Sequence, residues 1–81
     1  MTNVSENDIV KAIKRIVARN DRVHNSTWEY ATRSEIAREL GVEPSDISSE
    51  GATRDGPLGA AIEAGMIEEH PIYKGYFRVV T

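Results

Sequence analysis

Side chains that could act in acid–base, nucleophilic or metal chemistry are few and scattered along the chain. The two histidines, His24 and His70, lie far apart, and neither stands beside a nucleophile or a carboxylate motif. The adjacent Glu68 and Glu69 would project to opposite faces of a strand, so they do not form an acid–base dyad. Cysteine is absent, which removes thiolate nucleophiles, thiolate metal sites and disulfides. We therefore expect a protein that is not an enzyme and that binds no metal or cofactor.

Charge is distributed unevenly, in a way that concerns binding more than catalysis. The net charge of −3, from ten basic and thirteen acidic residues, disfavours nucleic acid as a partner because affinity for phosphates comes from cations. Five cations nonetheless fall within twelve residues: Lys11, Lys14, Arg15, Arg19 and Arg22. Residues 43–69 are acidic, with Arg54 as their single cation. The basic stripe is either a solvated helix face or an edge that faces phosphates, and both interpretations remain open.

The length and composition indicate one small globular domain. A chain of 81 residues has room for one hydrophobic core, and 40% hydrophobic with 28% charged residues is ordinary for such a domain. Neither a signal-peptide pattern nor a long apolar run occurs, so we expect a cytoplasmic protein without membrane contact. We assign residues 1–81 to a single domain, with residues 1–5 flexible.

Periodicity predicts a long first helix and then a short strand. Apolar side chains recur at helical spacing from Ile9 to Val17, behind helix-starting residues at positions 5–8. Residues 27–31 alternate aromatic with polar side chains and are typical of a strand. We expect Trp28 in this strand to be an anchor in the core or at its edge, and not a platform on which a base stacks.

Two shorter helices follow, and each is marked by signals at its ends. Thr32 and Glu35 form a capping-box pattern, and Gly41 is the left-handed residue expected just past the end of that helix. Pro57 suits the first position of the next helix, which Gly65 ends. The residues between these two helices are predicted to form a single helical turn and then a loop.

The last part of the chain carries the pattern of a β-hairpin. Strands are predicted on both sides of a two-residue turn, Lys74 and Gly75. That turn would pair Tyr73 with Tyr76 and Ile72 with Phe77. The buried face would then hold Ile72, Phe77 and Val79. The exposed face would hold Tyr73, Tyr76 and Arg78, with Lys74 at the tip.

The order helix, short strand, two helices and hairpin resembles that of the winged helix-turn-helix domain family. Residues 32–42 resemble the first half of the helix-turn-helix, in which a small residue, here Ala37, lets two helices approach closely and Gly41 makes the turn. Residues 58–68 resemble the end of the third helix running into the wing. The similarity covers residues 9–80 and implies a mainly helical α+β fold: a winged helix of three helices, a short strand and a C-terminal β-hairpin wing. We expect one core, formed by Ile13, Ile16, Ile36, Leu40, Leu58, Ile62 and Phe77.

The third helix departs from the pattern of family members that read DNA. In those proteins its exposed face contacts base edges through hydrogen-bonding side chains. Here that face would carry Gly59, Ala60, Glu63 and Ala64. Three of these side chains make no hydrogen bond and the fourth is anionic, so base reading would fall to Thr53 and Arg54 just before the helix.

We therefore predict a DNA-binding winged-helix module, a regulator of transcription or replication that contacts double-stranded DNA. The predicted DNA-binding residues are Arg33, Ser34, Arg38, Thr53, Arg54, Tyr73, Lys74, Tyr76 and Arg78. The alternative is an adaptor, a winged helix that binds another protein and not DNA. The basic helix and the wing favour DNA, whereas the net charge and the third helix favour a protein partner. A homodimer is also considered, because one small domain buries little DNA surface.

Overall fold

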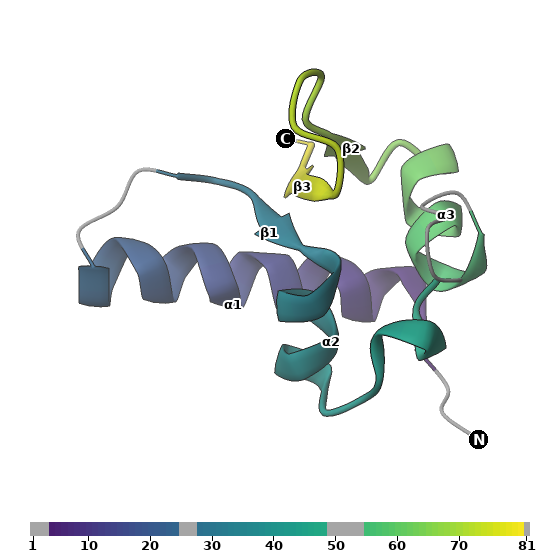
Figure 1. Cartoon of the computed structure of the whole chain (residues 1–81), viewed down its shortest axis with the longest axis horizontal. Helices are drawn as coiled ribbons and strands as arrows, with labels where there is room; N and C mark the ends of the chain where they lie inside the picture. The colour runs from purple at the N-terminus through teal and green to yellow at the C-terminus, as the bar shows by residue number, and fades with distance from the viewer. Residues whose placement is uncertain (1–3, 25–27, 49–54, 81) are drawn as a thin grey trace.

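The computed structural model describes residues 4–24, 28–48 and 55–80, which form a mainly helical α+β fold (Figure 1). The elements are α1 (Glu6–His24), β1 (Ala31–Thr32), α2 (Arg33–Leu40), the 3-10 helix η1 (Pro44–Asp46), α3 (Gly56–Glu63), β2 (Ile67–Glu69) and β3 (Tyr76–Val79). This fold class confirms the prediction, and the order of elements is compatible with a winged-helix layout. Among the described residues, no helix combines the length and the apolar character needed to cross a membrane.

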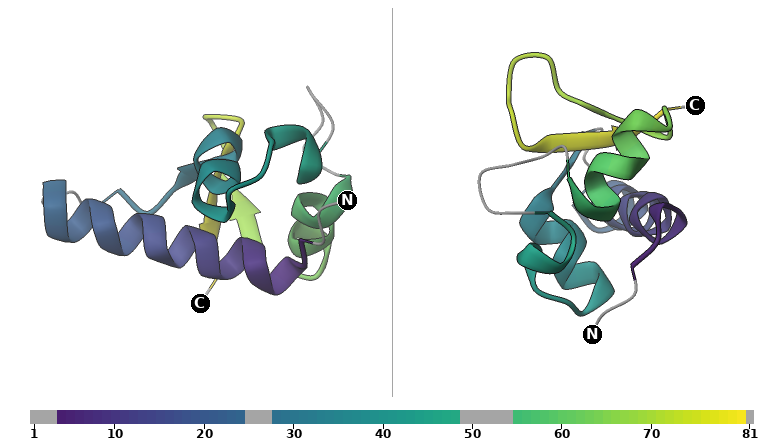
Figure 2. Two further views of the ribbon diagram at one scale, coloured as in Figure 1. Left: turned by 90° about the horizontal axis from the view of Figure 1, so that it is seen from below. Right: turned by 90° about the vertical axis from the view of Figure 1, so that its right-hand side faces the viewer.

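The three strands form one antiparallel sheet in the order β1-β3-β2. The long helix α1 contacts α2, α3 and the central strand β3, and so joins the helices to the sheet. Seen along α1, α2 and the connection between β2 and β3 project to the same side of that helix (Figure 2, right). We call this connection, residues 70–75, the wing.

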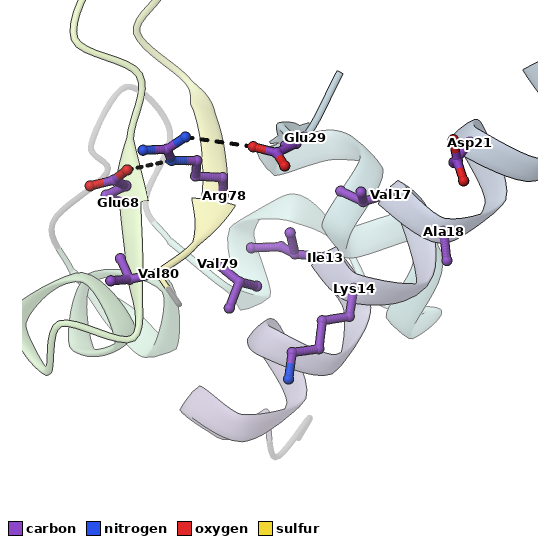
Figure 3. A pocket seen from close by; sticks show the side chains of 10 residues that line it. All are labelled: Ile13, Lys14, Val17, Ala18, Asp21, Glu29, Glu68, Arg78, Val79 and Val80. Atoms are coloured by element: carbon purple, nitrogen blue, oxygen red, sulfur yellow. Dashed lines mark hydrogen bonds and ion pairs between the residues drawn. The ribbon is translucent and has the colours of Figure 1, made fainter. Parts of the chain in front are cut away.

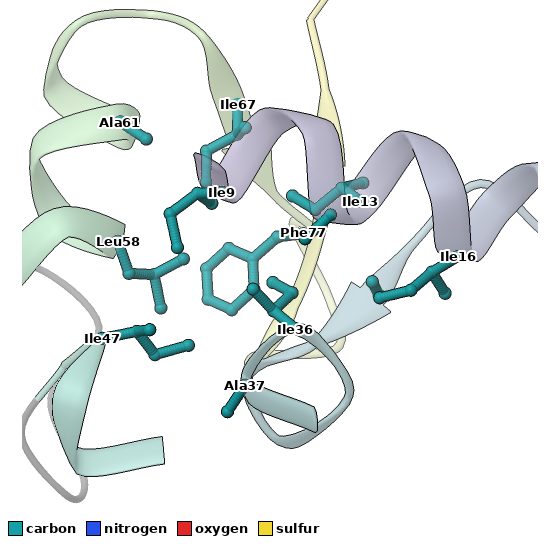
Figure 4. Packing of buried hydrophobic residues seen from close by; sticks show 12 residues of the cluster. Ile9, Ile13, Ile16, Ile36, Ala37, Ile47, Leu58, Ala61, Ile67 and Phe77 are labelled. Carbon is teal, nitrogen blue, oxygen red and sulfur yellow. The ribbon is translucent and has the colours of Figure 1, made fainter. Parts of the chain in front are cut away.

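The core lies where α1, α2 and α3 meet the inner face of the sheet. Phe77 of β3 is fully buried, and its ring lies in the middle of the cluster with Ile9, Ile36 and Leu58 around it (Figure 4). The buried hydrophobic residues are Ile9, Ala12, Ile13, Ile16, Ala31, Ile36, Ala37, Ile47, Leu58, Ala61, Ile67 and Phe77. Five of the seven predicted core residues are among them; Leu40 and Ile62 are only partly buried and pack against the cluster.

The ends of α2 form as the sequence predicts. The Glu35 amide donates to the Thr32 hydroxyl at 3.1 Å, and the Thr32 amide donates to the Glu35 carboxylate at 2.9 Å, which completes the capping box. Gly41 follows the helix with φ 72°, in the left-handed region. At the start of α1, the Ser5 amide donates to Asp8, and this hydrogen bond lowers the pKa of the Asp8 carboxyl.

The predicted two-residue turn of the hairpin is wrong. β2 ends at Glu69, which pairs with Phe77, and the six residues of the wing connect the strands. Neither Ile72 nor Tyr73 belongs to a strand, so the predicted pairs Tyr73–Tyr76 and Ile72–Phe77 do not form. Ile72 is 75% exposed and not part of a buried face. The physical reason is Pro71. The predicted register would set Pro71 opposite Arg78 at a hydrogen-bonded position, where a proline has no amide hydrogen to donate. In the structure Arg78 pairs with Glu68 instead, and the last hydrogen bond between the strands runs from the His70 amide to the Tyr76 carbonyl.

Two further expectations are corrected, the first only in part. Of the two places expected for Trp28, the core is wrong: the residue is 40% exposed, because the strand is shorter than predicted and Ala31 supplies its inward-facing side chain. Gly59, which was expected on the exposed face of α3, is buried together with Leu58 and Ala61.

Gly56 is required where α3 begins against the end of η1. Its φ is 62°, and a Cβ atom there would lie 2.7 Å from the backbone oxygen of Ile47. That oxygen already accepts a hydrogen bond from the Leu58 amide at 3.1 Å, so moving it away from a Cβ atom would weaken this hydrogen bond. Gly56 therefore sets the distance between the two helices.

The pair of variants Gly56→Ala and Gly41→Ala tests this close approach. Both place an L residue at positive φ, at a cost of about 1–2 kcal/mol, but a Cβ at Gly41 meets nothing within 4 Å. We expect the unfolding free energy, measured by urea denaturation, to fall further in Gly56→Ala than in Gly41→Ala. Equal losses would show that α3 does not depend on the contact with Ile47.

Candidate functional site

The predicted DNA-binding residues fall into two groups, on α2 and on the wing with β3. Seven of the nine lie in the described part of the chain; Thr53 and Arg54 lie outside it. The α2 group is Arg33, Ser34 and Arg38. The wing group is Tyr73, Lys74, Tyr76 and Arg78.

Arg33 has an internal role at the start of α2. Its guanidinium donates to the Ser48 hydroxyl at 2.7 Å and to the Ser48 carbonyl at 2.8 Å. Ser48 is buried, and Arg33 itself is half-buried. Arg33 therefore ties α2 to the chain that follows η1. Ser34 and Arg38, by contrast, are exposed on α2.

Arg78 lies on the outer face of the sheet between two carboxylates. It forms a hydrogen-bonded ion pair with Glu68 and a second ion pair with Glu29, with 3.6 Å between nitrogen and oxygen (Figure 3). Its guanidinium also lies over the ring of Tyr30, 5.5 Å from the centroid. The hydrogen bond to Glu68 raises the pKa of Arg78. The charge of Arg78, which the sequence assigns to DNA, is thus balanced within the domain.

The outer face carries a cluster of aromatic side chains that was not predicted as a unit. Its members are Trp28, Tyr30, His70, Tyr73 and Tyr76, which include the single tryptophan and all three tyrosines of the chain. Neighbouring rings lie 4.8–6.3 Å apart between centroids, in tilted, stacked and edge-on arrangements. Such contacts stabilise one another beyond simple burial. The predicted proximity of Tyr73 and Tyr76 is present as a ring contact, although not as a strand pair.

Two side chains accept hydrogen bonds from the backbone of the wing, Gly75 included. Nδ1 of His70 accepts hydrogen bonds from the amides of Ile72 and Tyr73, each at 3.0 Å. The Glu69 carboxylate accepts a third, from the Gly75 amide at 2.9 Å. Three backbone donors of the loop therefore have partners in Glu69 and His70, which gives His70 a structural role.

The tip of the wing points its side chains into solvent. Ile72 is 75% exposed, Tyr73 is 56% exposed, and Lys74 is also exposed. The loop therefore exposes an apolar, a phenolic and a cationic side chain at consecutive positions. Such a loop is suited to contact another molecule, because its three internal hydrogen bonds reduce the conformational freedom that would be lost on binding.

The basic stripe of α1 is partly neutralised by α2. Glu39 accepts hydrogen bonds from Arg15, at 3.0 Å, and from Arg19. The hydrogen bond from Arg19, and after it the one from Arg15, lowers the pKa of the Glu39 carboxyl. Two of the five cations of the stripe therefore act as a bridge between helices, and Lys11, Lys14 and Arg22 remain exposed.

Within residues 4–24, 28–48 and 55–80, no three histidine or carboxylate side chains converge in a way that could hold a metal ion. The candidate site that the structure offers is a surface formed by the wing, the aromatic cluster and the exposed residues of α2.

Some of these features had a signal in the sequence and others had none. Strand alternation around Ala31 places Tyr30 on the outer face, and the same parity around Phe77 places Tyr76 and Arg78 there, so the cluster could have been inferred from the correct register. The hydrogen bonds from Arg15 and Arg19 to Glu39 span 24 and 20 positions in the sequence, so no local pattern predicts them.

Comparison with known proteins gives no relative: no protein-family model, curated protein or solved structure matches the chain significantly.

Substitution of His70 tests how the wing is held. An asparagine side chain can accept hydrogen bonds from amides two or three residues on, whereas alanine cannot. We expect His70→Ala to speed hydrogen exchange at the Ile72 and Tyr73 amides about tenfold, as the loss of two modest hydrogen bonds implies. His70→Asn should preserve most of the protection, although both variants lose the ring. Unchanged exchange in His70→Ala would contradict the role assigned to Nδ1.

The Glu39 bridge predicts a pH-dependent stability. Because the pKa of Glu39 is lower in the folded than in the unfolded chain, where it is about 4.3, the bridge stabilises the fold above that value. Its contribution is lost as the pH falls through the folded-state pKa. We expect Glu39→Gln to lower the unfolding free energy at pH 7 by about 1 kcal/mol or less, and the difference from the wild type to shrink below pH 4.

The control is Glu63→Gln, at an exposed carboxylate of α3 for which the described residues offer no arginine partner. Its difference from the wild type should not show this pH dependence. Parallel behaviour of the two variants in urea denaturation at several pH values would rule out the bridge as the cause.

Proposed function

We propose that the domain binds duplex DNA, as a module of a regulator of transcription or replication, and that the wing is its main contact. One observation carries the proposal: hydrogen bonds to His70 brace the wing, and its consecutive residues Ile72, Tyr73 and Lys74 are all exposed. Proteins that bind the minor groove combine apolar side chains, which wedge between base steps, with cations. Contacts of cations and phenols with phosphates then set the orientation of the protein.

The carboxylates nearest the wing are engaged inside the domain, which reduces their repulsion of phosphates. Glu69 accepts from the Gly75 amide, and Glu68 is paired with Arg78. Lys74 has no carboxylate partner among the described residues, so its charge is available to a ligand.

Residues of α2 extend the proposed surface. The helix projects to the same side of α1 as the wing (Figure 2, right), and it exposes Ser34 and Arg38. We assign phosphate contacts to these two side chains. Arg33 and Arg78 are not assigned to phosphates, because their guanidinium groups already have internal partners. Base reading by Thr53 and Arg54 stays a prediction from the sequence.

An adaptor that binds a protein is the second candidate, favoured by a specific observation. The tryptophan and all three tyrosines gather on one partly exposed face, and aromatic side chains are enriched in protein interfaces. The exposed residues at the end of α3, Glu63 and Ala64, have neither a cationic nor a hydrogen-bond-donating side chain with which to bind a phosphate. This candidate would explain the net charge of −3 without difficulty.

Salt-dependent titrations of labelled duplex separate the two candidates. For the wild type we expect the logarithm of the binding constant to fall linearly with the logarithm of salt concentration. Lys74→Ala should weaken binding to a selected and a scrambled duplex alike and reduce the slope by about one unit. Arg54→Ala should instead lower the preference for the selected site, by about 1–3 kcal/mol if it reads a guanine.

Lys11→Ala is the matched control, since it removes the same charge from an exposed position on α1. If it reduces affinity and slope as much as Lys74→Ala, the wing is not the contact. If the wild type shows no salt-dependent binding to either duplex, DNA binding is ruled out and the adaptor takes its place.

A further inference from the structure

A groove of about 680 Å³ lies between α1 and the C-terminal end of β3, away from the wing (Figure 3). Val79 and Val80 form one wall, and Val80 is 44% exposed. The opposite wall is a stripe of α1 at positions 14, 17, 18 and 21. Residues with this spacing lie on one face of a helix.

The stripe on α1 has an apolar centre and opposite charges at its ends. Val17 and Ala18 form the centre, Lys14 lies one turn before it, and Asp21 one turn after it. Both charged side chains are exposed, and neither has an ion-pair partner in the described part of the chain. At about 1.5 Å per residue, the two charges are about 10 Å apart, too far to pair with each other.

We propose that the occupant of this groove is a second copy of the chain, in a symmetric dimer whose α1 helices pack antiparallel. In a two-fold interface, residue i contacts residue j and residue j contacts residue i. An axis that passes between Val17 and Ala18 places Lys14 opposite Asp21 of the partner subunit, and Asp21 opposite Lys14 of the partner subunit. The same α1 sequence therefore supplies both halves of two identical ion pairs.

The side chains around the stripe suit this arrangement. Ala18 is small and exposed, which lets two helix axes approach to the 8–10 Å of ordinary helix packing. Val17, Val79 and Val80 surround the contact with apolar surface. The other charged side chains of the groove, Arg78 with Glu68 and Glu29, are already paired with one another. They therefore leave Lys14 and Asp21 to determine the register.

The dimer leaves the proposed DNA-binding surface open. The wing enters β3 at Tyr76, whereas the groove lies at the other end of the strand, at Val79 and Val80. The two wings would thus point away from the interface. The inference goes beyond DNA binding and does not depend on it, and its test uses no nucleic acid.

The first measurement is sedimentation of the wild-type chain over a range of concentrations. We expect a reversible equilibrium between the 9.0 kDa monomer and a species of twice that mass. A chain that stays monomeric up to about 1 mM, where even an interaction of about 4 kcal/mol would be visible, overturns the proposal.

Charge exchange tests the register. Lys14→Asp leaves two acids on the stripe, and Asp21→Lys leaves two cations, so each variant alone should dimerise at least about tenfold more weakly than the wild type. Mixed together, the two variants should form a heterodimer, because each pair again joins opposite charges. The double variant Lys14→Asp/Asp21→Lys should recover the homodimer.

Lys74→Asp is the matched control, since it makes the same change of charge on the wing. It should leave the dimer unchanged, and circular dichroism should show that every variant is folded. Equal weakening by Lys14→Asp and Lys74→Asp would assign the effect to net charge and overturn the interface. Failure of the two single variants to associate when mixed would overturn the antiparallel register.

Discussion

The burial of Phe77 is the constraint on which the rest of the structure depends. Phe77 pairs with Ala31 on one side and with Glu69 on the other, and its ring fills the space between the sheet and the helices. Because side chains alternate along a strand, Tyr76 and Arg78 must then lie on the outer face. The aromatic cluster and the ion pairs of that face therefore follow from the placement of a single ring in the core.

Features set by neighbours in the sequence could be predicted, and they include most of the fold. The capping box at Thr32 and the left-handed Gly41 fix both ends of α2, since each acts over three or four residues. The apolar spacing in α1 gave the correct inner face for Ile13 and Ile16. On the candidate site, the sequence was sufficient to place Tyr76 and Arg78 together, because only the parity of β3 was needed.

Features set by competition between distant groups could not be predicted. The two-residue turn was a reasonable choice for Lys74 and Gly75, but Pro71 and the hydrogen bonds of His70 make a longer loop more stable. The neutralisation of Arg15 and Arg19 by Glu39, and of Arg78 by Glu68, joins separate elements. A count of charges along the chain therefore overstated the positive potential of α1 and of β3.

The aromatic cluster also divides the spectroscopic signals of the domain between two regions. The only tryptophan and all the tyrosines lie on the outer face of the sheet, so fluorescence and near-ultraviolet circular dichroism come from that face. Far-ultraviolet circular dichroism comes mainly from the three helices on the other side of Phe77. Two transitions that coincide would mean that sheet and helices melt as one cooperative unit, and separate midpoints would mean that the outer face loosens first.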